Sequence, residues 1–263
     1  MKAKTKTPDK VISLYNGSIK IEYFDRYHQY FVNGRKSIGV TTVTGVIDKS
    51  RVLIYWAINL SKNYLLEVAQ KGQITAEHIE TASKLHAQRK EEAAALGTQV
   101  HKWAEDYIGA KISKRIDIAL PTDERVLNGV LAFLKWVKEH KVKFLESERV
   151  IYSKKHKYIG TMDCVFTMGE EKHKIKHVGD FKTSKGVYDE MIFQVTAYEE
   201  AYKEETKAKF GDKFILRFDK ETAEFEPHVI PKEDHKDDLA AFVGLLTAKK
   251  RLMILEERKK ASY

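Results

Sequence analysis

The strongest constraint on the fold is a change of periodicity near residue 143. Upstream, residues 123–140 place apolar side chains at steps of three or four, as an amphipathic helix does. Residues 187–205 also read as a helix. Between the two lie three consecutive segments rich in β-branched and aromatic residues: 143–152, 158–168 and 174–182. This order predicts a mixed α/β protein with a central sheet.

The N-terminal part predicts a β-meander followed by helices. Asn16-Gly17 and Asn33-Gly34 are strong turn pairs that separate short strand-like segments at 11–15, 19–24 and 29–32. Thr41 and Thr42 can cap a short helix. Longer helices are expected at 51–70 and 75–110, with Gly109 as the stop of the second.

At the C-terminal end, segments 214–218 and 224–230 predict a hairpin, and Pro231 opens a charged helix. We expect residues 1–10, which are rich in Lys and Thr, to form a disordered basic tail. The remainder is expected to be one domain in three parts: a meander and helical elaboration (11–95), a core (96–230) and a C-terminal helix (231–263).

Composition limits the kinds of binding partner and the cellular compartment that we expect. Lys and Arg number 47 against 38 Asp and Glu, a formal charge of +9 that favours polyanions, although a solvated basic surface would look the same. Cys164 is the single cysteine, which excludes an intrachain disulfide or a cysteine metal cluster and suggests a reducing compartment. The start of the chain lacks the apolar stretch of a secretory signal, and no apolar run approaches the roughly 18 residues of a membrane span. We therefore expect an intracellular protein with no membrane partner.

Two motifs within the strand-like region carry chemistry. Gly160-Thr161-Met162-Asp163 puts a carboxylate into an otherwise apolar strand, and Asp180-Phe181-Lys182 puts an acid and a lysine on one face of another, with Phe181 pointing into the core. Taken alone, Asp163 could simply face solvent, and Asp180 with Lys182 could be a surface ion pair.

Taken together, the motifs point to a metal. Asp163 and Asp180 are 17 residues apart, so adjacent antiparallel strands would bring the two carboxylates together. Neighbouring carboxylates repel unless a cation lies between them, and Mg²⁺ prefers such oxygen ligands. Lys182 could then hold or activate the attacking water and offset charge on a phosphate.

These motifs, followed by Gln194-x-x-x-Tyr198, resemble the PD-(D/E)XK nuclease superfamily. More narrowly they are similar to its RecB-like exonuclease branch, which includes Cas4-type and mitochondrial-genome-maintenance exonucleases. His101 matches a histidine that precedes the carboxylates on an upstream helix of that branch, and Ser37–Trp56 is similar to its N-terminal part. The resemblance spans about residues 37–202. It implies a restriction-endonuclease-like fold, in which a mixed central sheet is flanked by helices with an N-terminal β-meander and a helical cap.

The resemblance also implies roles for individual residues. Asp163 and Asp180 would be the main metal ligands, His101 and the backbone carbonyl of Phe181 further ligands, and Lys182 the catalytic lysine. Gln194 and Tyr198 would help to place DNA or Lys182. With only Cys164 the chain cannot hold the four-cysteine iron–sulfur cluster of some members, so the expected cofactor is Mg²⁺ or Mn²⁺ with no iron–sulfur cluster.

Plainer interpretations stay open for several of these positions. His101 could be a histidine at the edge of the core, and Gln194 and Tyr198 ordinary helix-surface residues. Glu148 could support the site or be a solvated strand residue. A last group of candidates for phosphate contact could equally be a charged hairpin tip: Lys154, Lys155 and Lys157.

The resulting expectation is a metal-dependent deoxyribonuclease with DNA as its partner. The resemblance favours an exonuclease on single-stranded or resected duplex ends, acting in recombination, repair or phage DNA processing, with a recombination or single-strand-binding protein as a further expected partner. Two other functions remain open: a catalytically inactive nucleic-acid-binding module with the same fold, and a partner protein whose basic surface docks an acidic protein.

Overall fold

The computed structural model describes residues 7–115, 118–169, 175–219, 222 and 224–262. It contains six α-helices within these residues: α1 (Val40–Thr44), α2 (Ser50–Lys71), α3 (Ala76–Ile112), α4 (Glu124–Glu139), α5 (Asp189–Thr206) and α6 (His235–Ala261). The strands are β1 (Lys10–Leu14), β2 (Ile19–Phe24), β3 (Gln29–Val32), β4 (Arg35–Lys36), β5 (Ile38–Gly39), β6 (Lys143–Ser153), β7 (Tyr158–Thr167), β8 (His177–Lys182), β9 (Lys213–Phe218) and β10 (Phe225–Ile230). The predicted mixed α/β fold, with a mixed sheet, flanking helices and a meander, is confirmed.

The strands form two sheets. Strands β1 to β4 form an antiparallel meander in sequence order. The central sheet runs β10-β9-β8-β7-β5, with β6 along the other edge of β7. Strands β6, β7 and β8 are consecutive and antiparallel, whereas β8 pairs with β9 in parallel. The short strand β5 pairs in parallel with the first residues of β7, Tyr158 and Ile159.

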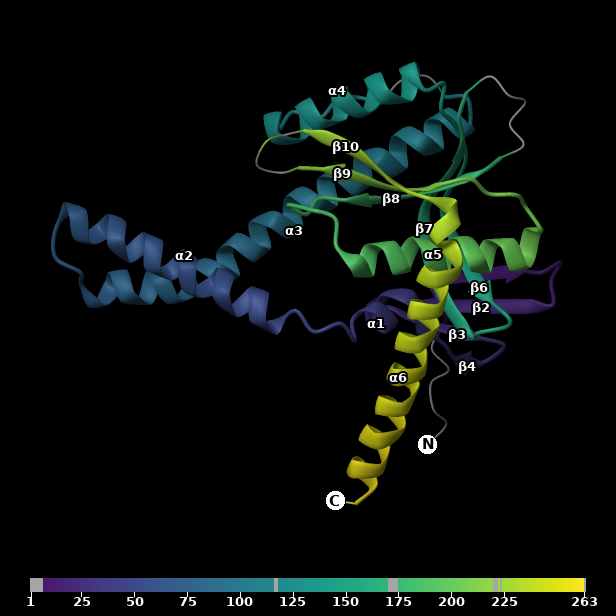
Figure 1. The fold of residues 1–263 in the computed structure, drawn as a ribbon, viewed down its shortest axis with the longest axis horizontal. Helices are drawn as coiled ribbons and strands as arrows, with labels where there is room; N and C mark the ends of the chain where they lie inside the picture. Colours follow the sequence, from purple (N-terminus) through teal and green to yellow (C-terminus); the bar gives the residue numbers. More distant parts are fainter. Residues whose placement is uncertain (1–6, 116–117, 170–174, 220–221, 223, 263) are drawn as a thin grey trace.

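Helices cover both faces of the central sheet (Figure 1). On one face α3 and α4 bury an aromatic cluster centred on Phe133, whose ring lies 5.8 Å from that of Phe181 on β8. On the opposite face α5 packs against the sheet, with α1 and α6 against it. Phe181 therefore points into the core on the face covered by α3 and α4, as predicted. Asp180 and Lys182 point to the other face, toward α5.

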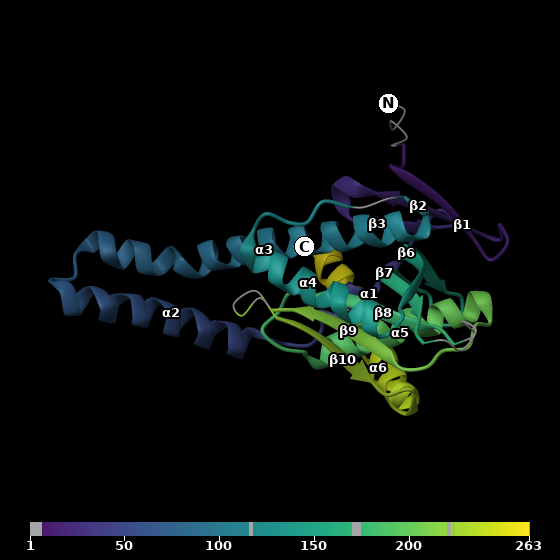
Figure 2. The ribbon, with the colours of Figure 1, turned by 90° about the horizontal axis from the view of Figure 1, so that it is seen from above.

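The predicted helical elaboration forms an arm. Figures 1 and 2 show α2 and the N-terminal half of α3 side by side, projecting well beyond the sheet. The Ser61 hydroxyl donates to the Ala82 carbonyl at 2.7 Å and ties the two helices together. Helix α2 has no buried residue, so the arm contributes little to the core.

Several predicted boundaries need correction. Helix α3 does not stop at Gly109 but continues to Ile112, because Ile108 and Ala110 are buried and the left-handed turn falls on Lys114 instead. Thr41 lies inside α1 rather than capping it, because Gly39 takes the cap position.

The predicted end of the basic tail at residue 10 is also wrong. Its residues 1–6 lie outside the described residues, and Lys10 already pairs with Tyr23 in the meander. The predicted turn at Gly169-Glu170 lies only partly within the described chain, since Glu170 falls outside it. None of the helices described combines the length and the apolar character that a membrane crossing needs.

Candidate metal centre and active site

Asp163 and Asp180 meet where strands β7 and β8 stop pairing. The last paired residues at this end are Cys164 and Gly179, and the two acids are the next residues on their strands. One carboxylate oxygen of Asp163, Oδ2, accepts a hydrogen bond from the backbone N–H of Phe181 at 2.7 Å. Asp180 is only 1% exposed. The antiparallel pairing thus brings the two carboxylates to one place, as the spacing of the motifs predicts.

Burial makes the Asp163 carboxylate hard to ionise without a cation. Desolvation, together with the charge of Asp180, raises the pKa of Asp163 well above its usual value. A divalent cation beside two carboxylates reverses that preference, because it stabilises both charged forms. The residues therefore fit an oxygen-preferring cation such as Mg²⁺ or Mn²⁺.

Lys182 forms an ion pair with Asp180 through Nζ and Oδ2. Burial by itself would lower the pKa of Lys182, but the negative charges of Asp180 and Asp163 outweigh it and raise that pKa. The lysine is therefore a largely buried cation held beside both acids. Its side chain keeps 20% of its surface exposed, so it can reach a group that enters from solvent.

Glu148 faces the same centre from β6. Its neighbours Ser147 and Arg149 pair with Cys164 and Met162, which places Glu148 opposite Asp163. Its backbone adopts a left-handed conformation, with φ of 48°, that is uncommon for a residue other than glycine. Burial, followed by the charge of Glu105, raises the pKa of Glu148 to about 7. This environment differs from that of a solvated strand residue.

Glu105 was not among the predicted residues. It follows His101 by four positions on α3, a spacing that puts both on one helical face, so this spacing was the signal that could have found it. It contributes charge at the edge of the centre, where its side chain is 46% exposed.

Metal binding is expected to weaken as the pH falls below about 7. The pKa of Glu148 is raised because burial favours its protonated form in the metal-free protein. The protonated Glu148 therefore stabilises the folded state below pH 4.5, and this stabilisation is lost as the pH rises through 7. A metal has to displace that proton, and the apparent affinity for the metal should fall by up to about tenfold for each pH unit when one proton is displaced.

Calorimetric titration with Mn²⁺ at pH 6, 7 and 8 measures this dependence of metal affinity on pH. Glu148→Gln should give a shallower slope than the unaltered protein; an equal slope in both proteins would exclude Glu148 as the group that titrates.

His101 lies at the rim of the centre. Its Nδ1 is 3.7 Å from Oδ2 of Asp163, and its ring meets the ring of Phe181 edge-on at 6.2 Å. The side chain is 41% exposed. From this position it can add a nitrogen ligand.

Gln194 and Tyr198 connect α5 to the two acids. The Gln194 amide nitrogen donates to Oδ1 of Asp180 at 3.1 Å and to the Tyr198 hydroxyl at 2.8 Å. Both residues are buried, so they are not ordinary helix-surface residues. A side chain at Gly160 would put its Cβ 2.6 Å from the Tyr198 ring, which explains the glycine of the first motif.

The three predicted phosphate-contact lysines lie elsewhere. Lys154, Lys155 and Lys157 occupy the turn between β6 and β7, before the first residue of β7, whereas Asp163 lies in the middle of that strand. Lys154 donates to the Ser18 hydroxyl at 2.9 Å and lies over the ring of Tyr15. The structure does not bring these lysines to the carboxylates, because β7 runs six residues from Lys157 to Asp163, about 20 Å for an extended strand.

The chain is only distantly similar to known proteins. No family model matches the sequence, and no curated protein matches it. Two solved structures are similar: LHK-Exo in complex with dAMP, at 11% identity and a TM-score of 0.32, over 61% of this chain and 85% of that one; and a candidate exonuclease from Eubacterium rectale, at 14% identity and a TM-score of 0.32, over 83% of this chain and 70% of that one. Both are named as exonucleases, but a likeness this distant does not carry their activity over. The chain is a mixed α/β protein that brings Asp163, Asp180 and Lys182 together beside its central sheet.

Proposed function

We propose that this protein is a divalent-metal-dependent deoxyribonuclease that hydrolyses the phosphodiester bonds of DNA. One observation carries the proposal: two carboxylates, the buried Asp180 and the largely buried Asp163, lie opposite each other where β7 and β8 stop pairing, with Lys182 paired to Asp180. Two acids and a buried cation are costly to maintain without a use, because charges removed from water rarely add stability. The arrangement suits a reaction in which charge develops on a phosphate.

The metal would be held by Asp163 and Asp180, with Glu148, His101 and the carbonyl of Phe181 as further ligands. When bound, Mg²⁺ or Mn²⁺ supplies a Lewis acid for the phosphate oxygen and a water of lowered pKa. The hydrogen bonds from Phe181 N–H to Asp163 and from Gln194 to Asp180 fix the two carboxylates in place.

Lys182 acts on the phosphate and on water. Because its pKa is raised, it is protonated at neutral pH and can donate to a phosphate oxygen on which negative charge builds up. It can also hold the attacking water in line with the bond to be broken. Its partner Asp180 keeps it beside the site in the absence of substrate.

DNA is the proposed substrate because the chain carries a formal charge of +9, which favours a polyanion. Within this proposal we favour an exonuclease of the RecB-like branch that lacks an iron–sulfur cluster and works in recombination, repair or phage DNA processing. A single-strand-binding or recombination protein is the partner that such a role implies.

The proposal is tested by digestion of end-labelled linear DNA and closed circular DNA of the same sequence with Mg²⁺ or Mn²⁺. We expect the linear DNA to be degraded from its ends and the closed circle to persist; EDTA should stop the reaction and added Mg²⁺ should restore it. Cleavage that continues at the same rate in EDTA would contradict the metal-dependent mechanism. DNA binding without any cleavage would identify the alternative, an inactive nucleic-acid-binding module.

A further inference from the structure

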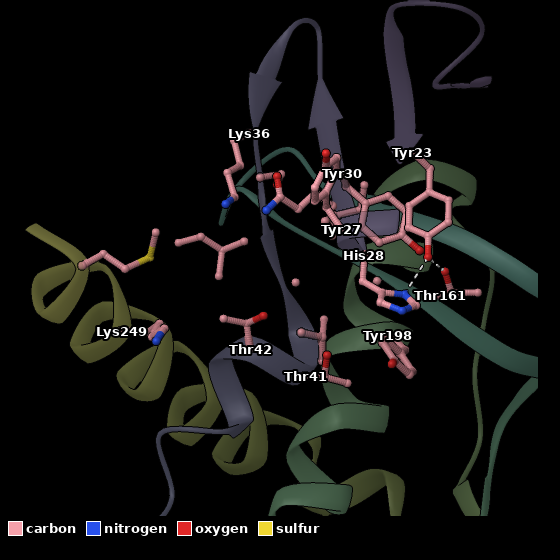
Figure 3. Close-up of a pocket in the computed structure, with 18 of the residues that line it drawn as sticks. Tyr23, Tyr27, His28, Tyr30, Lys36, Thr41, Thr42, Thr161, Tyr198 and Lys249 are labelled. Atoms are coloured by element: carbon pink, nitrogen blue, oxygen red, sulfur yellow. Dashed lines mark hydrogen bonds between the residues drawn. The ribbon is translucent and has the colours of Figure 1, made fainter. Parts of the chain in front are cut away.

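A cavity of about 780 Å³ opens between the meander, α1, the start of β7 and α6 (Figure 3). Three tyrosines of the meander line it: Tyr23, Tyr27 and Tyr30. Two lysines also line it, Lys36 from β4 and Lys249 from α6, and in Figure 3 both lie away from the group of tyrosines. The cavity therefore combines an aromatic wall with cationic groups.

The aromatic wall is held in place by its own contacts. The rings of Tyr23 and Tyr30 lie 4.6 Å apart, and the Tyr23 hydroxyl is 3.0 Å from Nδ1 of His28. Tyr27 is 42% exposed, so part of its ring is open to a ligand. Flat, positioned rings of this kind are what nucleobases stack on.

The cavity adjoins the proposed active site through two residues. Thr161 lies two positions before Asp163, and its hydroxyl is 2.8 Å from the Tyr30 hydroxyl. Tyr198 lines the cavity, and the Gln194 amide that donates to its hydroxyl also donates to Asp180. The wall of the cavity is thus within one or two residues of the two carboxylates.

We propose that this cavity holds unpaired nucleotides of the DNA strand that is cut at Asp163 and Asp180, an inference that rests on the proposed nuclease function. Its volume falls within the roughly 300–1,000 Å³ of small-ligand sites, which suits a few nucleotides and not a duplex. Aromatic stacking combined with lysines is the recognition chemistry of single strands. Glu256 and Glu257 also border the cavity. Their carboxylates can accept hydrogen bonds from the exocyclic amino groups of bases, so the phosphates are expected on the side of the lysines.

The test compares two cavity variants with two matched controls. Tyr27→Ala and Lys36→Ala alter exposed cavity residues, whereas Tyr55→Ala on the arm and Lys135→Ala on α4 alter exposed residues elsewhere. Fluorescence anisotropy in EDTA measures binding of a labelled 12-nucleotide single strand and of a blunt 12-base-pair duplex. Tyr27→Ala removes a ring on which one base would stack. This variant should therefore bind the single strand about fivefold more weakly, or more weakly still. Lys36→Ala should weaken it less and reduce its dependence on salt.

The result separates the cavity from the active site. Hydrolysis of bis(p-nitrophenyl) phosphate with Mn²⁺ reports on the metal centre without a DNA strand, and the unaltered protein and all four variants should hydrolyse it at equal rates. If the cavity variants bind the single strand as tightly as the controls, or lose duplex binding equally, the cavity inference is overturned. If the unaltered protein hydrolyses neither the diester nor DNA, the nuclease function fails, whatever the binding data show.

Discussion

Replacing Asp180 with asparagine is expected to slow DNA cleavage by about a hundred- to a thousandfold, the effect of losing one strong electrostatic contact in an active site. Asparagine keeps the size of the side chain and an oxygen that can still accept from Gln194. It removes the negative charge that would bind the metal and that pairs with Lys182. The rate is measured on end-labelled linear DNA with Mg²⁺, and Mn²⁺ affinity is measured by calorimetry on the same preparation.

Asp189→Asn is the matched control, because Asp189 is an exposed acid in the first turn of α5. It should cleave DNA at the rate of the unaltered protein. Circular dichroism and thermal unfolding check that Asp180→Asn is folded, because its Lys182 loses its ion-pair partner and retains only the charges of Asp163 and Glu190 nearby. A folded Asp180→Asn protein that cleaves at the normal rate would refute the assignment.

Lys182→Met is expected to lower cleavage by about a hundredfold or more while Mn²⁺ still binds. Methionine matches the length and apolar body of lysine but cannot donate to a phosphate oxygen or hold water. The carboxylates that would bind the metal remain, so Mn²⁺ affinity is expected to be kept. The measurement pairs single-turnover cleavage rates with calorimetry.

Lys138→Met, at an exposed position on α4, is the control for loss of one positive charge and should keep the normal rate. The two site variants are informative together. Asp180→Asn should lose both metal and activity, whereas Lys182→Met should lose activity and keep the metal. If Lys182→Met also loses the metal, Lys182 is a structural partner of Asp180 and not the catalytic lysine.

Local sequence signals predicted much of the fold. The Asn-Gly pairs mark the meander turns because they tolerate positive φ, and Asn16, Asn33 and both glycines adopt it. Helix α4 begins after Asp123, whose side chain accepts from the Arg125 N–H, as an N-cap residue does. The antiparallel order of β7 and β8 also follows from the sequence, because a short connection joins two strand-like segments.

Other features depended on contacts between segments distant in the sequence. The end of α3 was misplaced because buried packing at Ile108 and Ala110 outweighs the weak helix propensity of Gly109. The turn lysines, such as Lys154, were assigned to phosphates on charge alone, but that turn packs against the meander. Charge indicates an affinity and not a position in space.

The sequence by itself determined that Asp180 and Lys182 share one face, because strand geometry repeats every two residues. Only the tertiary structure decided what surrounds them. Glu148 and Gln194 reach the acids from β6 and α5, and the cavity arises where the meander and α6 approach the start of β7. These placements depend on how sheets and helices pack, which no local pattern specifies.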